Sequence, residues 1–251
     1  MISRLMRPKM RLDLFMSERG YADSRTDAKN FISGGFVKVD GKTVTKPAFD
    51  VSEKSEIVVD KSSKKYVSRG GLKLEGAISA FGVDVVGRLA IDIGSSSGGF
   101  TDCLLKHGAA HVIAVDSGTD QLVSALRENP AVTVTEGYNA RYMKPEDFEY
   151  EPNLAVMDVS FISATFIFSA LHGVLADGGD FICLIKPQFE VGREHIGKGG
   201  IVKSESARAF AVDKVIANAK NFGFEYVAHT ESSIQGGDGN VEYVAHFINR
   251  K

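Results

Sequence analysis

The sequence predicts a large α/β domain built on a doubly wound sheet, preceded by a small α+β domain. Two observations lead to this prediction. Beyond residue 70, short apolar segments typical of buried strands alternate with longer helical segments, as they do when helices cover both faces of a sheet. Before residue 60 the chain is basic and carries a strong hairpin signal. Because the polar stretch KSSKKYVSRG lies between these parts, we place the small domain at 1–60, a linker at 61–70 and the large domain at 71–251.

The small domain is expected to contain two helices and a hairpin. Ser24 is a good N-cap for the second helix, and Asp40-Gly41 is a dipeptide that favours a tight hairpin turn. The predicted elements are a helix within 11–19, a helix from Ser24 to Gly34-Gly35, a hairpin that includes Val37 and Val39, and a strand at 56–59. Such a short domain has little core.

Basic residues are concentrated in the first quarter of the chain. Residues 1–65 hold 14 Lys+Arg and 9 Asp+Glu, a net charge of +5, whereas the remainder carries −7. A basic domain on an acidic body favours contact with a polyanion, although a solvated basic surface is the simpler alternative. The candidate contacts to successive phosphates are Arg11, Arg25, Lys29, Lys38 and Lys42.

Two motifs in the small domain are Ser24-Arg25-x-x-Ala28-x-x-x-Ile32 and Gly35-x-Val37-x-Val39-Asp40-Gly41-Lys42. Together they resemble the RNA-binding domain first described in ribosomal small-subunit protein four. The resemblance covers about residues 9–59 and implies binding to structured RNA.

The composition argues against several classes of protein. A chain of 251 residues with 43% hydrophobic residues and a net charge of −2 is expected to fold. Cys103 and Cys183 are too few for a disulfide framework or a cysteine-based zinc site, and we interpret them as inert thiols. His107 and His195 lack partners at metal-ligand spacing, so no metal is expected. The sequence shows neither a secretion signal nor a membrane-spanning apolar run, which predicts a soluble, cytoplasmic protein.

Strands and helices alternate through the large domain. The strands are predicted at 89–93, 112–116, 132–136, 154–159, 181–185, 224–229 and 241–248, and the helices at 71–81, 99–107, 120–128, 163–175 and 204–221. Segments such as LAIDI and NLAVMDV are almost wholly apolar, as expected for strands that are covered on both faces. In this fold ligands bind at the carboxyl ends of the strands.

The segment DIGSSSGGFTD, residues 92–102, leaves a predicted strand and enters a helix. Its glycines allow a ligand to approach the backbone, and the helix start offers free N–H groups. The segment lacks the G-x-G-x-x-G and P-loop patterns, and Asp92 disfavours a pyrophosphate. An acid here suits a ligand with a cationic amino-acid group and a ribose, such as S-adenosylmethionine, with Asp116 at the ribose diol. A tight turn capped by Asp92 is the alternative.

Four charged residues are expected near strand ends or helix starts, facing the ligand crevice: Lys73, Asp158, Lys186 and Glu242. A charge that ends an apolar strand is costly to desolvate unless it is paired. Asp158 and Lys186 end two strands that we expect to be neighbours, which favours a functional pair. Each residue taken alone fits a surface charge or a salt bridge better.

Three motifs in the large domain are Asp92-x-Gly94-x-Ser96-x-Gly98-Gly99-Phe100-Thr101-Asp102, MDVSFIS and IKPQFE. With the small domain they resemble the TlyA family, often labelled haemolysin A, which belongs with the FtsJ-like RNA 2′-O-ribose methyltransferases. The resemblance covers nearly the whole chain and implies a Rossmann-like class I methyltransferase sheet, S-adenosylmethionine as cofactor and a cytidine 2′-OH of ribosomal RNA as substrate. The catalytic set that it implies is Lys73, Asp158, Lys186 and Glu242. The implied donor site comprises Asp92, Gly94, Ser96, Gly98, Gly99, Phe100, Asp116 and, on the adenine side, Asn139.

The implied catalytic set suits methylation of a ribose hydroxyl. The 2′-OH is a poor nucleophile, and Lys186 can take its proton only when the amine is neutral, a state that burial and a second cation, Lys73, both favour. The negative charge of Asp158 opposes the neutral form of Lys186, but Asp158 orients the amines and the hydroxyl. Glu242 holds Lys73 or the ribose. Alignment of the reacting atoms can supply much of the rate instead.

Three other functions are open from the sequence. The family label suggests a membrane-active haemolysin, but the chain shows no amphipathic basic helix, spanning segment or export signal. An RNA-binding or ribosome-associated factor without catalysis fits the small domain, although the four-residue set argues against it. Methylation of a base or a protein usually requires a sequence such as Asn-Pro-Pro-Tyr, whereas residues 158–161 read DVSF.

Overall fold

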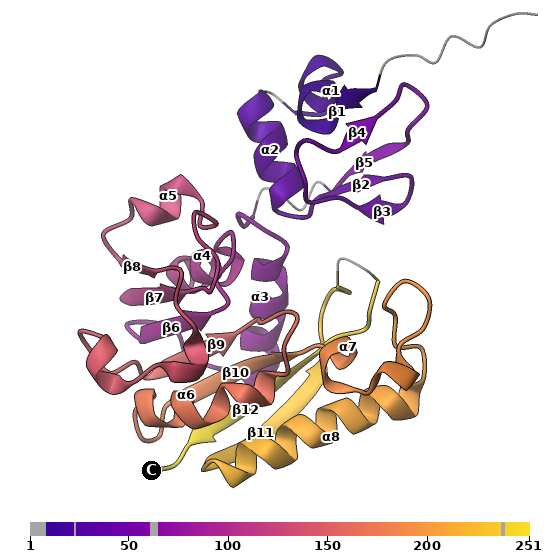
Figure 1. Cartoon of the computed structure of the whole chain (residues 1–251). Coiled ribbons are helices and arrows are strands. Elements are labelled where there is room, and N and C mark those ends of the chain that lie inside the picture. The colour runs from indigo at the N-terminus through magenta and orange to yellow at the C-terminus, as the bar shows by residue number, and fades with distance from the viewer. Residues whose placement is uncertain (1–8, 23, 61–64, 237–238) are drawn as a thin grey trace, which may run out of the picture. The chain divides into compact units, whose positions relative to one another are not determined.

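The computed structural model describes residues 9–22, 24–60, 65–236 and 239–251. The chain forms two compact units, Met1–Arg69 and Gly70–Lys251 (Figure 1). Of the proposed linker, residues 61–64 lie outside the described part of the chain, and Gly70 already belongs to a helix.

The described part of the small unit contains two helices and two short sheets. Its elements are β1 (Met10–Arg11), α1 (Leu12–Glu18), α2 (Arg25–Ser33), β2 (Val37–Val39), β3 (Lys42–Thr43), β4 (Asp50–Val51) and β5 (Ile57–Val59). Strand β2 lies between β3 and β5 in an antiparallel sheet, and β1 pairs with β4. The predicted helices, hairpin and later strand are confirmed, whereas β1 and β4 are too short to give a sequence pattern.

Local sequence explains the turns of the small unit. The Ser24 hydroxyl accepts a hydrogen bond from the Asp27 amide and so caps α2. In the hairpin, Asp40 and Gly41 have φ of 50° and 78°, the left-handed values that suit a two-residue turn between twisted strands. The inward residues of β2 join the apolar faces of α1 and α2 in one core.

The large unit is built on a seven-stranded sheet with the order β11-β12-β10-β9-β6-β7-β8. Its strands are β6 (Leu89–Ile93), β7 (His111–Val115), β8 (Val132–Thr135), β9 (Leu154–Met157), β10 (Asp180–Ile185), β11 (Phe224–Glu231) and β12 (Tyr243–Asn249). Neighbours from β10 to β8 run parallel, while β12 is antiparallel to both β10 and β11. The α/β prediction is confirmed, with an antiparallel edge that the pattern did not specify.

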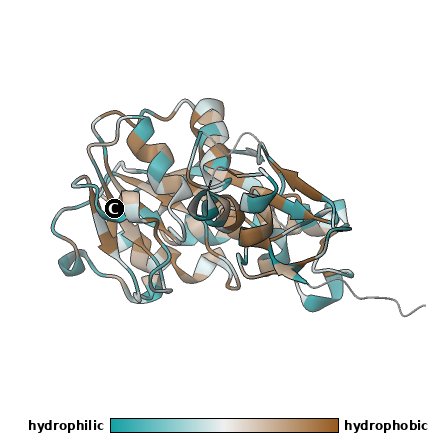
Figure 2. Cartoon of the chain, turned by 90° about the horizontal axis from the view of Figure 1, so that it is seen from above, coloured by the Kyte–Doolittle hydropathy of each residue, from teal (hydrophilic) through white to brown (hydrophobic). Residues whose placement is uncertain are grey.

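Helices cover both faces of this sheet. They are α3 (Gly70–Phe81), α4 (Gly99–Lys106), α5 (Ser124–Arg127), α6 (Phe168–Val174), α7 (Pro187–Glu190) and α8 (Glu205–Asn221), with 3₁₀ turns at Ala140–Tyr142, Pro145–Asp147, Ala164–Phe166 and Arg193–His195. Odd-numbered strand residues such as Ile91 and Phe181 pack with α6 and α8 into the main core, and α3 packs on α4 at the other face. Figure 2 shows the hydrophobic strands and the hydrophilic residues of many outer turns.

One predicted helix is largely absent. The segment 120–128 was expected to be helical, but only Ser124–Arg127 forms a helical turn. The carboxylate of Glu136, which follows β8, accepts hydrogen bonds from the backbone amides of residues 120–122. Those amides are therefore held by a side chain of the neighbouring segment, and Asp120 takes a left-handed φ of 55°.

Smaller differences affect the segments around the predicted site. The helix expected at 163–175 is divided into a 3₁₀ turn and α6 by Ile167, which does not continue the first turn. Glu242 directly precedes β12 instead of lying within the strand. Cys103 and Cys183 are both buried, and burial raises the pKa of the Cys183 thiol well above its usual value. Within the described ranges, no helix has both the length and the apolar character needed to cross a membrane.

Candidate active site

A cavity of about 400 Å³ is formed by the turns that follow β6, β7, β8 and β9. Strand order reverses here, since β7 lies on one side of β6 and β9 on the other, and doubly wound sheets bind ligands at such switch points. Four predicted donor-site residues and one predicted catalytic residue line the cavity: Gly94, Ser96, Asp116, Asn139 and Asp158. The carboxyl ends of distant strands therefore meet where the sequence pattern predicted a ligand.

Gly94 allows two of these strand ends to approach each other. Its φ of +85° is left-handed, and a Cβ at this position would overlap the carbonyl oxygen of Asp158. Gly98 precedes α4 with a φ of +97°, and a side chain there would strike Leu122 and Leu126. Gly94 thus keeps two cavity walls close together, and Gly98 lets the start of α4 pack against the segment that follows β7.

Asp116 follows β7 and organises the turn beside the cavity. Its carboxylate oxygens accept hydrogen bonds from the Ser96 amide at 2.8 Å and from the Gly118 amide at 2.7 Å. Each oxygen keeps a second lone pair, so Asp116 retains acceptors for a ligand hydroxyl. Asn139 caps the 3₁₀ turn after β8, where its side-chain oxygen accepts a hydrogen bond from the Arg141 amide.

Asp92 is buried next to the cavity-lining Ile93 and is not itself part of the lining. Its side chain is fully buried, and Oδ2 accepts a 2.6 Å hydrogen bond from Thr101 Oγ1 of α4. The other oxygen, Oδ1, meets no hydrogen-bond donor among the described residues. Burial raises the pKa of Asp92 to about 7, against the opposing effect of Thr101. Three more predicted donor-site residues stand at the start of α4, outside the cavity lining: Gly98, Gly99 and Phe100.

Three observations show that the cavity fits S-adenosylmethionine. Its volume lies in the range of small-ligand sites. Within the described residues, Asp92 Oδ1 is a buried acceptor without a donor, which a cationic ligand group can satisfy directly or through a water molecule. Asp116 offers lone pairs to ribose hydroxyls, and the apolar lining residues Val115 and Ile162 offer contact to a base.

Two ion pairs join the four predicted catalytic residues. Asp158 follows β9 and Lys186 follows the neighbouring strand β10, and Oδ1 and Nζ of these residues are 2.5 Å apart. Lys73, in the first turn of α3, pairs with Glu242 at 2.5 Å between Nζ and Oε2. Both partners of the second pair are buried. The structure therefore brings together residues from four separate segments.

The two ion pairs act on each other. Burial alone would raise the pKa of Asp158, but the charges of Lys186 and Lys73 outweigh burial and hold this pKa below its usual value. Lys186 also donates a 2.7 Å hydrogen bond to Ser160 Oγ. Because Asp158 and Ser160 line the cavity, the Lys186 amine is fixed at the cavity wall.

A buried acid that sequence reasoning missed ties the loop after β9 to α7. Glu190 is 5% exposed and accepts hydrogen bonds from the Ser163 hydroxyl at 2.6 Å and from the following backbone amide at 2.8 Å. Lys214 of α8 donates to the same carboxylate at 3.1 Å. Since Asp158 begins that loop and Lys186 precedes α7, the contact fixes the spacing of the pair. Glu190 is the acid of the motif IKPQFE, the only signal that pointed to it.

Phe161 was also missed, and it lines the cavity in an unusual conformation. Its φ of 67° is rare for an aromatic residue, and the residue is 89% exposed. The ring centroid lies 5.4 Å from that of Phe189. An exposed aromatic ring beside a pocket can stack on a flat ligand such as a nucleobase. The motif MDVSFIS contains Phe161, but neither exposure nor φ can be read from one sequence.

The predicted RNA-contacting cations are exposed on the small unit. Arg11 ends β1 and Arg25 begins α2, and both bind the carboxylate of Asp13. Lys29 lies one turn after Arg25 on α2, as its spacing predicted. No sequence pattern connects Arg11 with Arg25, because Asp13 has no periodic signature.

The two hairpin lysines are also exposed but do not share a face. The register places Lys38 opposite Thr43 and Lys42 opposite Val39. Directly opposed residues lie on one face of a hairpin, so Lys38 and Lys42 point to different faces. The candidate RNA contacts therefore divide into a group at α2 and two separate hairpin positions.

Among the described strands of the sheet, β12 is the one antiparallel strand, and the cavity lies at the switch point. This sheet order and this cavity position are those of S-adenosylmethionine-dependent class I methyltransferases. A solved member with this fold is fibrillarin from Aeropyrum pernix with bound S-adenosylmethionine, at a TM-score of 0.50 and 15% identity over 71% of this chain and 76% of that chain. The large unit matches the FtsJ-like methyltransferase family over residues 66–248, and the small unit matches the S4 domain over residues 10–57. The chain belongs to the FtsJ-like methyltransferase family and carries an S4 domain, as the sequence motifs predicted.

Relatives resemble the chain over both units. A Mycobacterium tuberculosis protein named 16S/23S rRNA (cytidine-2′-O)-methyltransferase TlyA is 43% identical over 95% of this chain and 89% of its own length. A Brachyspira hyodysenteriae protein named Hemolysin A is 43% identical over 95% of this chain and its whole length. The solved structure of a Streptococcus thermophilus protein is 43% identical, with a TM-score of 0.77 over 97% of this chain and 90% of that chain.

Proposed function

We propose that this chain transfers a methyl group from S-adenosylmethionine to the 2′-OH of a cytidine ribose in ribosomal RNA. The observation that carries the proposal is the ion pair of Asp158 with Lys186 at the wall of a donor-sized cavity, next to the buried pair of Lys73 with Glu242, whose lysine charge acts on Asp158. The name of the mycobacterial relative supports the nucleotide, and the S4 domain supports an RNA substrate. Ribosomal subunits are the proposed partners and the cytoplasm the proposed location.

In this proposal the methyl donor binds in the cavity at the switch point. Asp116 would accept hydrogen bonds from its ribose, Asn139 would hold the adenine side, and the buried Asp92 would accept the amino-acid ammonium group directly or through a water molecule. Gly94 and Ser96 shape the wall, while Gly98, Gly99 and Phe100 support it from α4. The bound donor supplies an electrophilic methyl group.

Lys186 and Asp158 act on the acceptor hydroxyl. Lys186, once it has given up the proton that it holds in its ion pair with Asp158, would accept the 2′-OH proton while the methyl carbon leaves the donor sulfur and bonds to the ribose oxygen. Asp158 would orient the amine and the hydroxyl. Lys73 supplies positive charge near the oxygen as it becomes negative, and Glu242 holds Lys73 in place. Fixed positions for these groups reduce the reorganisation that the reaction requires.

Tritiated methyl transfer to small and large ribosomal subunits, taken from cells that lack the protein, tests the proposal after nucleoside digestion. We expect labelled 2′-O-methylcytidine with the wild-type chain. Lys186→Ala should abolish transfer, because it removes the proton acceptor, yet leave donor binding nearly unchanged.

The matched control is Lys220→Ala, which removes an exposed lysine near the end of α8 that stacks on Tyr226. It should leave both transfer and donor binding unchanged. Wild-type transfer by Lys186→Ala would exclude Lys186 as the base. Donor binding without label in either subunit would contradict the proposed substrate.

A further inference from the structure

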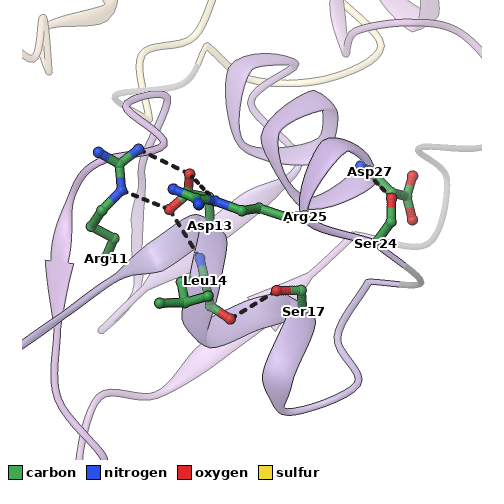
Figure 3. Close-up of polar contacts among 7 residues, drawn as sticks. All are labelled: Arg11, Asp13, Leu14, Ser17, Ser24, Arg25 and Asp27. Carbon is green, nitrogen blue, oxygen red and sulfur yellow. Dashed lines mark hydrogen bonds and ion pairs between the residues drawn. The ribbon is translucent and has the colours of Figure 1, made fainter.

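We infer that Asp13 builds a phosphate clamp on the small unit by holding Arg11 and Arg25 in one fixed arrangement (Figure 3). The inference rests on the proposed RNA substrate and adds a residue that does not itself touch RNA. Asp13 is a positioning residue, since it acts through the two arginines that meet the phosphate.

The clamp is anchored on a buried carboxylate. The Asp13 side chain is fully buried, whereas the side chains of Arg11 and Arg25 are 46% and 49% exposed. Oδ1 accepts hydrogen bonds from Arg11 Nε at 3.0 Å and from the Leu14 amide at 2.9 Å. Oδ2 accepts from Arg11 Nη2 at 2.9 Å and from Arg25 Nε at 3.1 Å. Figure 3 shows the two guanidinium groups reaching Asp13 from different directions.

Both arginines keep donors for an anion. Arg11 commits Nε and one hydrogen of Nη2 to Asp13, and Arg25 commits Nε, so the remaining Nη hydrogens can bind phosphate oxygens. Because both guanidinium groups bind the Asp13 carboxylate, they are held close together despite their mutual repulsion. The three residues carry a net charge of +1 with two half-exposed guanidinium groups, which is the chemistry of a phosphate site.

The carboxylate stays ionised over the range in which RNA is stable. The hydrogen bond from Arg11 lowers the pKa of Asp13 to about 2, with burial opposing and the bond from Arg25 adding to the shift. The arginines are therefore ordered before RNA arrives, and binding does not have to immobilise two long side chains.

If Asp13 had only a structural role, its replacement by a neutral residue would affect RNA affinity differently from the loss of a clamp. Removing an acid from a basic surface should by itself strengthen RNA binding, because binding is dominated by phosphate attraction. Asp50 provides the matched control: it is exposed, pairs with Arg11 across β1 and β4, and acts on Arg11 through its charge. Asp13→Asn and Asp50→Asn remove the same charge near the same arginine, but only the first removes the anchor.

The experiment measures the affinity of the full-length chain for purified ribosomal subunits at several salt concentrations. We expect Asp13→Asn to weaken binding about tenfold. It should also reduce the slope of log affinity against log salt by about 1–2, the contribution of one or two phosphate contacts. Asp50→Asn should bind as tightly as wild type or more tightly, and donor binding should be unchanged in both variants.

Two further variants separate the clamp from loss of folding. Ser24→Ala removes the cap of α2 and lowers the stability of the small unit while leaving Asp13 and both guanidinium groups intact; it should retain the wild-type salt slope. In the Arg11→Gln/Arg25→Gln background, Asp13→Asn should cause no additional loss, since its effect passes through the arginines.

The outcomes distinguish this inference from the proposed function. Failure of the wild-type chain to bind either subunit would contradict the RNA substrate itself. Wild-type binding together with an unchanged salt slope in Asp13→Asn, or a full additional loss in the double-arginine background, would overturn the clamp alone.

Discussion

Asp92 carries a buried carboxyl whose pKa is raised to about 7, chiefly by burial. In an unfolded chain an aspartate ionises near pH 4. Between these values the unfolded chain has lost a proton that folded Asp92 still holds, so this residue lowers the free energy of unfolding as the pH rises from about 4 to 7. The same carboxyl that we assign to the donor ammonium therefore destabilises the donor-free chain near neutral pH.

Asp92→Asn should accordingly stabilise the chain at pH 7.5 by up to roughly 4 kcal/mol, and by almost nothing at pH 4. The asparagine oxygen can still accept the hydrogen bond from Thr101. Urea unfolding at both pH values measures the difference, with the exposed Asp213→Asn as control. A difference that is the same at both pH values would contradict the raised pKa.

Phe161 leads to a prediction about the nucleotide. If its exposed ring stacks on the target base, Phe161→Ala should raise KM for the ribosomal subunit about 5- to 100-fold, the value of one lost base–aromatic contact. Because Phe161 also lines the donor cavity, donor affinity should fall too, but by less than KM for the subunit rises. The control is Phe210→Ala, which removes another exposed ring from α8. Equal effects on KM from both variants would count against stacking at Phe161.

At the scale of the elements, Glu190 joins three segments of the large unit. It binds the 3₁₀ turn after β9 and Lys214 of α8 from its own position in α7. Glu190→Ala leaves buried donors without their acceptor and should lower the free energy of unfolding by about 1–3 kcal/mol. Because the spacing of Asp158 and Lys186 depends on this contact, kcat should fall more than donor affinity.

Single-turnover methyl transfer and donor titration, measured on the same preparation, separate these two effects. Lys214→Ala removes one of the partners but leaves Ser163 bound to the carboxylate, so it should cost less in kcat. A loss of donor affinity equal to the loss of kcat would show that Glu190 supports the cavity and not the ion pair.

The elements also show which features a sequence can predict. The alternation of apolar strands with helices, the Ser24 cap and the Asp40-Gly41 turn follow from local patterns, and all are present. The helix predicted at 120–128 is wrong because Glu136, which lies outside that window, binds its first amides.

The site residues divide in the same way. The strand-end positions of Asp158 and Lys186 could be predicted because parallel strands end at one edge of a sheet. Asp13, Phe161 and Glu190 could not, because burial, exposure or φ depends on contacts that tertiary folding creates. Asp92 was placed in the donor pocket from its motif, and only the structure shows that it is fully buried and not part of the cavity lining.

At the scale of the whole molecule, the excess of basic residues and the proposed catalytic residues lie in different units. The basic residues of 1–65 belong largely to the S4 domain, whereas the cavity and the two ion pairs of the proposed catalytic residues lie within Gly70–Lys251. Deletion of residues 1–60 should therefore preserve donor binding and remove most of the affinity for ribosomal subunits. Donor titration and subunit binding by the truncated chain check this prediction. Unchanged subunit affinity would assign RNA recognition to the large unit.

The ion pair between Lys73 and Glu242 has a consequence for synthesis. Its partners are 169 positions apart, and the antiparallel strand that follows Glu242 pairs with two strands made before it. A growing polypeptide can complete its S4 domain long before it contains the second half of this pair. Translation therefore produces an RNA-binding segment first and an enzyme later, and a product that stops short of residue 242 would occupy RNA without modifying it.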